Sequence, residues 1–281
     1  MKIKKQPVIS WLLDEKYKPT KDWEITVPNT SNPNHVGYLS SGIKWLNEIR
    51  EQKPDWGLPE LLMPSFEKVM QKSAKSFYSI DHQLFQEFYN DDVCGILLHK
   101  QFGTVVYGFG EDTLHVWLFR NVDGYSILYN YFYFTSTPDN IRHVHCWPTL
   151  TKDPQLFNQD SSDKEDIYSY VANLLITYLA VKKYAEVETI VVPTNGRLLV
   201  EDVILGYKHK EKVLNESGQE VIIMDSRWFV KIINDNDIFV RGFFRMQRYK
   251  NDNGEWDKKL IFVDSFIRHG YHRNAKIEDE E

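Results

Sequence analysis

Cysteine is scarce in this chain, and long apolar runs are absent. Only Cys94 and Cys146 occur among 281 residues, and they form no C-x-x-C pair, so the sequence offers no disulfide framework. The longest apolar segment, Val171 to Val181, is well short of the ~20 residues that a membrane span needs. The basic first five residues are not followed by the apolar core of a secretory signal. We therefore expect a cytoplasmic protein that makes no contact with a membrane.

Catalytic motifs are lacking as well. The chain has no phosphate-binding glycine loop, no Ser/His/Asp or Cys/His nucleophile signature, and no acid spacing typical of general acid–base catalysis or of a metal-dependent nuclease. His143 and His145 would share one face of a strand, but no third metal ligand lies at an informative spacing and Cys146 would point to the other face. We expect a polar strand edge there, no cofactor or metal, and a binding protein rather than an enzyme.

The hydrophobic content of 42% is that of an ordinary globular protein with a core. Apolar residues at helical spacing predict helices over 42–51, 65–77, 81–90 and 161–184. Short apolar or alternating runs between turn residues predict strands over 93–98, 104–109, 113–119, 125–135 and 188–192. The connections between the first four strands are short, which favours antiparallel pairing. The predicted fold class is α+β: N-terminal helices and one long helix packed on a mainly antiparallel sheet, plus a C-terminal strand-helix-basic hairpin module.

The strand predicted over 125–135 is unusually aromatic; its rings are Tyr125, Tyr129, Tyr131, Phe132, Tyr133 and Phe134. Such rings either pack in the core or present a recognition surface on one face of the sheet. We expect core and edge packing, with the recognition surface as the alternative.

Composition divides the chain into five parts. We expect an irregular and helical N-terminal arm over 1–62, an α+β body over 63–206, a linker over 207–220, a basic module over 221–275 and an acidic tail over 276–281. The linker is predicted because 207–220 is rich in Lys, Glu, Asn and Gly. The module begins with an apolar strand over 221–224 and continues with a helix that has Trp228, Phe229, Ile232 and Ile233 on one side.

Positive charge is gathered in the module. Between Val240 and Lys276 there are nine Lys/Arg and four Asp/Glu, a local charge of +5 in a chain whose net charge is −6. Two strands, Phe239 to Tyr249 and Lys258 to Asp264, flank an Asn-Gly turn, which is a strong hairpin signal. Such a charge asymmetry indicates an anionic partner.

Alternation along the first strand of this hairpin separates two kinds of side chain. Val240, Gly242, Phe244 and Met246 would face one side, and arginines interleaved with aromatic rings would face the other. Guanidinium groups match phosphate or carboxylate, and rings stack on bases, so nucleic acid or an acidic peptide would suit this face. The alternative is a solvated hairpin whose arginines prevent edge aggregation. The candidate binding residues are Arg241, Phe243, Arg245, Gln247, Arg248, Tyr249, Lys258, Lys259, Arg268, His269 and Arg273.

The same stretch carries a family resemblance. The segments 225–229 (DSRWF), 240–249 (VRGFFRMQRY), 258–266 (KKLIFVDSF) and 269–273 (HGYHR) resemble the C-terminal signature of a family found on phages, plasmids and other mobile elements. The characterised representative of that family is a type V-A anti-CRISPR protein. Phe243 stands where the family usually has His, and Phe262 where it usually has Trp. The resemblance covers about the last fifth of the chain.

The resemblance implies a function. The characterised member lowers production of the type V-A CRISPR effector by recognising the nascent effector's N-terminal peptide, which leads to loss of its messenger. By similarity, we expect a mobile-element factor that evades host defence in the host cytosol, with RNA or a translating ribosome and its nascent peptide as partners. The alternatives are a phage accessory protein that binds nucleic acid through the hairpin without anti-CRISPR activity, and a nuclease with an unrecognised centre.

Overall fold

The structure is a computed structural model that describes residues 2–4, 33–53, 55–64, 66–67, 70, 80–122, 125–146, 166–184, 189–204, 207–224, 237–240, 242–264 and 266–269. Within these ranges its helices are α2 (Pro33–Gln52), α4 (Asp81–Asn90) and α5 (Asp166–Tyr184). These confirm the helices predicted over 42–51 and 81–90, and the described part of the one over 161–184. The first helix is longer than predicted, because Pro33 suits a first helical position. Residues 64, 66–67 and 70 are helical, and the rest of the helix predicted over 65–77 lies outside the described residues.

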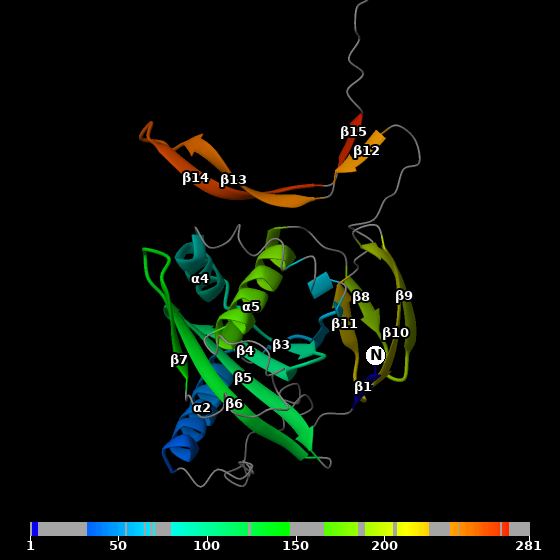
Figure 1. Cartoon of the computed structure of the whole chain (residues 1–281). Helices are drawn as coiled ribbons and strands as arrows, with labels where there is room; N and C mark the ends of the chain where they lie inside the picture. The colour runs from blue at the N-terminus through cyan, green and yellow to red at the C-terminus, as the bar shows by residue number, and fades with distance from the viewer. Residues whose placement is uncertain are drawn as a thin grey trace, which may run out of the picture.

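An eight-stranded sheet forms the centre of the molecule, in the order β7-β6-β5-β4-β3-β2-β11-β8 (Figure 1). The four predicted consecutive strands are confirmed as an antiparallel meander that β7 extends. At the other end β2 pairs in parallel with both β3 and β11. The bounds are β2 (Glu60–Leu61), β3 (Cys94–His99), β4 (Gly103–Gly110), β5 (Thr113–Val122), β6 (Tyr125–Ser136), β7 (Arg142–Cys146), β8 (Thr189–Val192) and β11 (Val221–Met224).

Helices cover both faces of this sheet. Neighbouring residues of a strand point to opposite faces, and on β6 Tyr131 meets α2 while Phe132 meets α5. Gly42 lets α2 approach closely, because a Cβ there would lie 2.5 Å from the Tyr131 ring. The Trp117 indole fixes the contact by donating to the Gly42 carbonyl at 2.7 Å. The α+β prediction, with the long helix lying on the sheet, is thus confirmed.

The aromatic strand β6 packs in the core, as expected. Tyr129, Tyr131, Phe132 and Phe134 are buried, and Tyr133 is half-buried. Tyr131 belongs to a row of stacked rings that also includes His115 and Trp117. The side chain of Tyr125 lies outside those that the structure describes.

The prediction of a linker over 207–220 is wrong. Residues Tyr207–Glu216 form strand β10, which pairs with β9 (Arg197–Ile204) and β1 (Lys2–Lys4) in a three-stranded sheet. Asn215 at the end of β10 is fully buried, and its amide donates to the carbonyls of Val192 and Gln219. A polar composition indicates exposed side chains, but it does not prevent a backbone from pairing. Strand β9 was not predicted at all.

Two other boundaries also change. The strand over 221–224 exists, but it is β11 of the central sheet, between β2 and β8, and does not begin a separate module. The N-terminal arm is not separate either, because β2 lies inside the same sheet and Ile3 of β1 is buried. The helix predicted around Trp228, the acidic tail over 276–281 and much of the arm lie outside the described residues.

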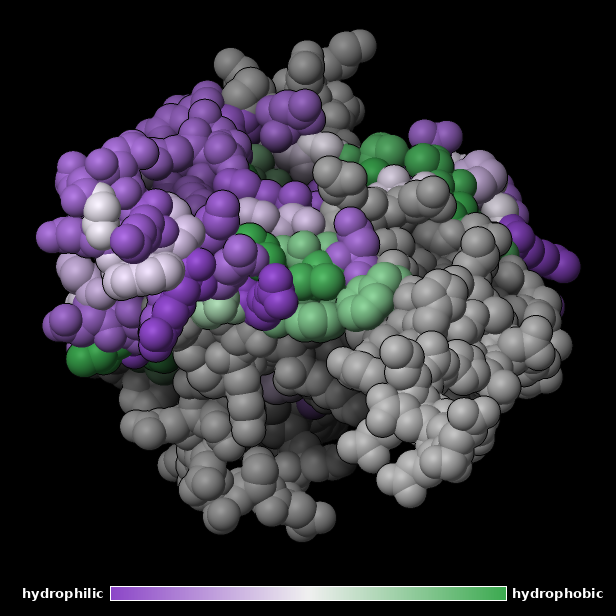
Figure 2. Space-filling view, turned by 90° about the horizontal axis from the view of Figure 1, so that it is seen from above, coloured by the Kyte–Doolittle hydropathy of each residue, from purple (hydrophilic) through white to green (hydrophobic). Residues whose placement is uncertain are grey.

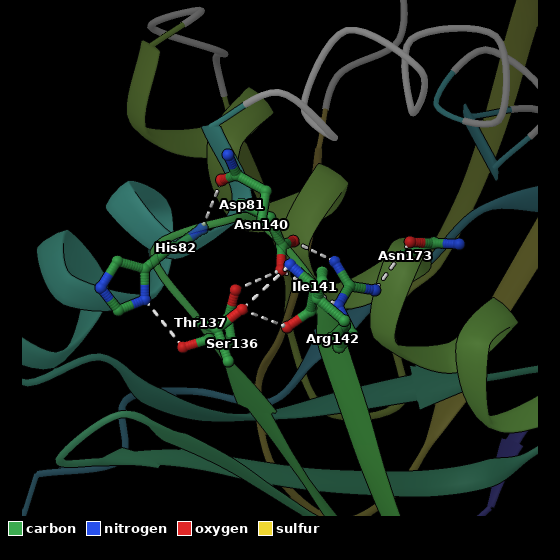
Figure 3. A network of polar contacts seen from close by, with 8 residues as sticks. All are labelled: Asp81, His82, Ser136, Thr137, Asn140, Ile141, Arg142 and Asn173. Carbon is green, nitrogen blue, oxygen red and sulfur yellow. Dashed lines mark hydrogen bonds and ion pairs between the residues drawn. The ribbon is translucent and has the colours of Figure 1, made fainter.

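A buried ion pair ties three elements together (Figure 3). Asp81, the first residue of α4, is 2% exposed and accepts hydrogen bonds from Arg142 of β7 and from the Ser136 hydroxyl at 2.8 Å. The Arg142 guanidinium also donates to Asn173 of α5 at 2.7 Å. His82 contacts the Ser136 carbonyl at 2.8 Å. Each charge in this network therefore has a specific partner.

No helix within the described ranges is long and apolar enough to cross a membrane.

Candidate nucleic-acid interface

The predicted basic hairpin exists and lies along one side of the molecule, above α4 and α5 in Figure 1. Its strands are β13 (Phe243–Lys250) and β14 (Trp256–Val263), which pair antiparallel. Strands β12 (Asp237–Val240) and β15 (Phe266–His269) continue the pairing in the same register, since Val240 pairs with Phe266 and Phe243 with Val263.

The turn of the hairpin explains its register. The Asn251 side chain accepts from the backbone N–H groups of Asn253 and Glu255, at 3.1 and 2.9 Å. Gly254 has φ +82°, a left-handed conformation that glycine adopts without steric cost. The turn therefore ends with Lys250 opposite Trp256.

The inner face of the hairpin anchors it to the body. Phe244 lies opposite Phe262, with ring centroids 4.8 Å apart, and Met246 lies opposite Leu260. Phe244 and Leu260 are each 8% exposed and belong to the core cluster of the molecule. The alternation predicted from sequence is confirmed, because Phe244 and Met246 face inward while Phe243, Arg245 and Gln247 are exposed.

Beyond this anchor, the inner face becomes cationic. Arg248 lies directly opposite Lys258, and Lys250 lies opposite Trp256. We call these four residues the cationic tip. The Lys250 ammonium lies 5.5 Å from the centroid of the Trp256 ring, which is 70% exposed. No acidic residue occupies a paired position on the inner face of β13 and β14.

The pairing of Arg248 with Lys258 has an energetic cost. Like charges directly opposite one another on antiparallel strands destabilise the pair, by a few tenths of a kcal/mol up to ~1 kcal/mol. Within the described part of the chain, neither residue forms an ion pair that would offset this cost. The arrangement is one that an anionic ligand would stabilise.

The outer face of the hairpin is mixed. Arg245 donates to Gln247 at 3.2 Å, and the Lys259 ammonium lies 5.3 Å from the Tyr249 ring centroid. Asp257 accepts from the Tyr249 hydroxyl and is the main cause that raises the pKa of Tyr249. Seen from above, hydrophilic side chains gather over the distal part of the hairpin, and an apolar group lies beside them (Figure 2). Two cations and one carboxylate share the paired positions of this face, so it is less basic than the tip.

The structure divides the residues that the sequence singled out. Phe243, Arg245, Gln247, Tyr249 and Lys259 lie on the outer face, whereas Arg248 and Lys258 lie on the inner face. Strand β15 contains Arg268 and His269, and Arg241 and Arg273 lie outside the described residues. Sequence reasoning missed Lys250 and Trp256. Counting outward in register from the Asn-Gly turn would have placed both beside Arg248 and Lys258.

His143 and His145 lie on the exposed face of β7, an edge strand of the central sheet. The polar strand edge that we expected is therefore confirmed. The His145 ring stacks on Tyr133 with centroids 4.4 Å apart, and its Nε2 contacts the Thr135 hydroxyl at 3.3 Å. Among the residues that the structure describes, no group of three or more His, Cys, Asp or Glu side chains is arranged to hold a metal ion.

Comparison of the chain with protein-family models, curated proteins and solved structures finds no match. The resemblance of the C-terminal segment therefore stays a prediction, and the hairpin itself is the basis for a functional proposal.

Proposed function

We propose that the protein binds single-stranded RNA through the cationic tip of the hairpin. The observation that carries this proposal is the exposed pair of Arg248 and Lys258, which lie opposite each other without a counter-ion among the described residues. Phosphates placed between the two side chains would replace their repulsion with charge-assisted hydrogen bonds.

The aromatic ring beside these cations favours a single strand. Trp256 is largely exposed and lies next to Lys250, so an unstacked base has both a ring surface and a neighbouring cation available. Base–aromatic stacking contributes ~1–3 kcal/mol per base and needs a base that is not already paired. An acidic peptide would use the cations and leave the ring without a partner. A single strand uses both.

The C-terminal resemblance extends the proposal to a biological role. The protein acts in the host cytosol as an anti-CRISPR-like factor of a phage or mobile element. It engages the messenger of a host defence effector while that messenger is translated, and so lowers production of the effector. The tip contacts the messenger, and the nascent peptide is the second partner that the resemblance implies.

Salt dependence of RNA binding tests the role of the tip. Affinity for a fluorescent single-stranded oligoribonucleotide is measured by anisotropy at several salt concentrations. Arg248→Ala together with Lys258→Ala should reduce the log–log salt slope by roughly 1.4, at ~0.7 per phosphate contact on a single strand. Trp256→Ala should weaken binding with the slope unchanged, because stacking releases no counterions.

A matched control removes two exposed cations of the body. Lys44→Ala together with Lys100→Ala changes the net charge equally, at positions on α2 and in the turn after β3. This control should leave both affinity and slope unchanged. If it behaves like the tip variant, or if the tip variant binds as wild type does, the tip is not the RNA site.

The biological role is tested by capture from host cells with and without nuclease treatment. Retention of ribosomes and of one defence-effector messenger, lost with Trp256→Ala, supports the anti-CRISPR-like role. Retention of many unrelated RNAs favours the alternative, a nucleic-acid-binding accessory protein without anti-CRISPR activity. Cleavage of RNA by pure protein, abolished by a chelator, would instead indicate a nuclease.

A further inference from the structure

A second candidate site lies on the central sheet, where α2 packs on β5 and β6. Four rings gather there, and we call them the ring cluster: Trp45 of α2, His115 and Trp117 of β5, and Tyr131 of β6. The centroids of the other three rings lie between 5.1 and 6.1 Å from that of His115. His115 is therefore the centre of the cluster.

Exposure to solvent differs across the ring cluster. Trp45 is 47% exposed, whereas Trp117 and Tyr131 are almost completely buried. The ring planes of Trp45 and His115 are inclined by only 29°, so the exposed indole stacks on the buried imidazole. An oxidant in solution can therefore reach Trp45, but it reaches Tyr131 only through the stacked rings.

The buried end of the cluster is a hydrogen bond between a tyrosine and a histidine. The Tyr131 hydroxyl lies 2.9 Å from His115 Nδ1, and it has no other hydrogen-bond partner among the residues that the structure describes. A buried phenol needs an acceptor for its proton, so Nδ1 accepts this hydrogen bond. The ring proton then lies on Nε2 and points to the Thr113 hydroxyl at 3.0 Å.

Both partners of this hydrogen bond are neutral at about pH 7. Burial lowers the pKa of the His115 ring to about 4, and burial is also the main cause that raises the pKa of Tyr131 well above its usual range. The imidazole therefore keeps a free lone pair on Nδ1, and the phenol keeps its proton. A phenol that loses an electron is a far stronger acid than an imidazolium ion, so its proton moves to Nδ1 when it is oxidised.

Trp117 lacks such a base. Its indole N–H donates to the Gly42 carbonyl at 2.7 Å, and a carbonyl oxygen does not take up the proton. Oxidised Trp117 would remain a cation radical and would take an electron from Tyr131, whose ring centroid is 5.7 Å away. The positive charge then lies on His115, whose two N–H groups point to the Tyr131 oxygen and the Thr113 hydroxyl.

We propose that Tyr131 is a redox-active tyrosine, which is oxidised through Trp45 and has His115 as its proton acceptor. An outer-sphere one-electron oxidant takes an electron from the Trp45 indole, and the indole cation radical takes one from Tyr131. The O–H bond of Tyr131 breaks, and its proton forms an N–H bond at His115 Nδ1. The products are neutral Trp45, a tyrosyl radical and an imidazolium ion. A one-electron reductant reverses both transfers. This activity is independent of RNA binding at the hairpin.

Flash oxidation of the full-length chain tests the proposal. A light pulse on a ruthenium tris-bipyridyl complex with a cobalt(III) quencher creates the oxidant, and electron paramagnetic resonance identifies the radical. Wild type should give a tyrosyl radical whose yield falls severalfold in Tyr131→Phe, which keeps the buried ring and loses only the hydroxyl. Tyr249→Phe, on the hairpin, is the control and should retain the yield. Equal yields in wild type and Tyr131→Phe would overturn the proposal.

His115→Gln tests the proton acceptor. Glutamine accepts a hydrogen bond but is not a base, so the tyrosyl radical should form about 100-fold more slowly, at the lower end of the 10²–10⁴ that a general base contributes. In wild type, the radical should also form more slowly in heavy water, because an O–H bond breaks in the same step. The second comparison needs no substitution, so it does not depend on how a variant folds. An unchanged rate in heavy water contradicts transfer of the proton to His115.

The two exposed tryptophans test the point of entry. Trp45→Phe should lower the yield of the Tyr131 radical severalfold, because a phenyl ring is harder to oxidise than an indole. Trp256→Phe removes a more exposed indole, 70% against 47%, and as the matched control should not lower it. In Tyr131→Phe, mass spectrometry should find severalfold more oxygenated Trp45 after the flash, since the indole radical is no longer reduced. Equal radical yields in Trp45→Phe and wild type would remove Trp45 from the route.

Discussion

The body and the hairpin treat charge in opposite ways. In the body, Asp81 and Arg142 are buried together, and every strong charge of that network has a partner from a distant part of the chain. In the hairpin, Arg248 and Lys258 face each other in solvent, and neither forms an ion pair with another residue that the structure describes. Paired charges fix the positions of helices and strands. Unpaired like charges lower the stability of the hairpin, but they remain available to a ligand. The same residue types therefore have different roles in the two regions.

The largest effect should come from breaking the ion pair of the body. Arg142→Met leaves the Asp81 carboxylate buried without its cation, which should lower the free energy of unfolding by about 4 kcal/mol. Chemical denaturation measures this loss. Lys44→Met removes an exposed partner of Glu48 and should change stability by less than about 0.5 kcal/mol. Similar losses in the two variants would erase the distinction between buried and exposed pairs.

The buried His115 gives the body a pH dependence. Burial lowers the pKa of its ring to about 4 from 6.5. Between these two pH values the unfolded chain binds a proton at His115 that the folded chain does not. The contribution of neutral, buried His115 to the free energy of unfolding is therefore fully present above about pH 6.5. It falls by about 3 kcal/mol as the pH drops toward 4. His115→Gln should flatten this slope in denaturation curves recorded at several pH values. The control His143→Gln, on the exposed edge of β7, should retain it.

The third prediction concerns the anchor of the hairpin. Phe244→Ala removes the most buried ring of the inner face and should cost about 2 kcal/mol locally, less than the 3–5 typical of a deep core. Hydrogen exchange should quicken in β13 and β14 while β4 and β5 stay protected. Phe243→Ala, the neighbouring ring on the outer face, should leave exchange unchanged. Faster exchange throughout the central sheet would show that body and hairpin unfold together.

The smallest effect separates stability from binding. Lys258→Glu replaces the repulsion of Arg248 by a cross-strand ion pair, so the hairpin should gain about 0.5 kcal/mol. RNA affinity should fall at the same time, because the ammonium group that contacts a phosphate is replaced by a carboxylate. Hydrogen exchange and anisotropy measure the two effects. The control is Lys259→Glu. Lys259 lies opposite Gln247 on the other face, so this substitution should not stabilise the hairpin.

Much of the local structure followed from sequence periodicity. The helix over 81–90, the antiparallel meander and the hairpin with its inward Phe244 and Met246 were predicted, because each depends on neighbours a few residues away. The division of the hairpin into an apolar part that anchors it and the cationic tip could be recognised only from the pairing register across the turn. Lys250 and Trp256 were missed for that reason.

The amino-acid sequence by itself determined which segments are helical, which alternate, and where positive charge gathers, since these depend on periodicity and composition. Only the tertiary structure decided that β2 and β11, from distant parts of the chain, pair in parallel in the central sheet. It also decided that the polar segment 207–216 pairs as β10, because backbone hydrogen bonds form regardless of side-chain polarity. The cavity lined by Asp55, Asp91 and Lys182 likewise exists only in three dimensions, because these residues come from separate parts of the chain.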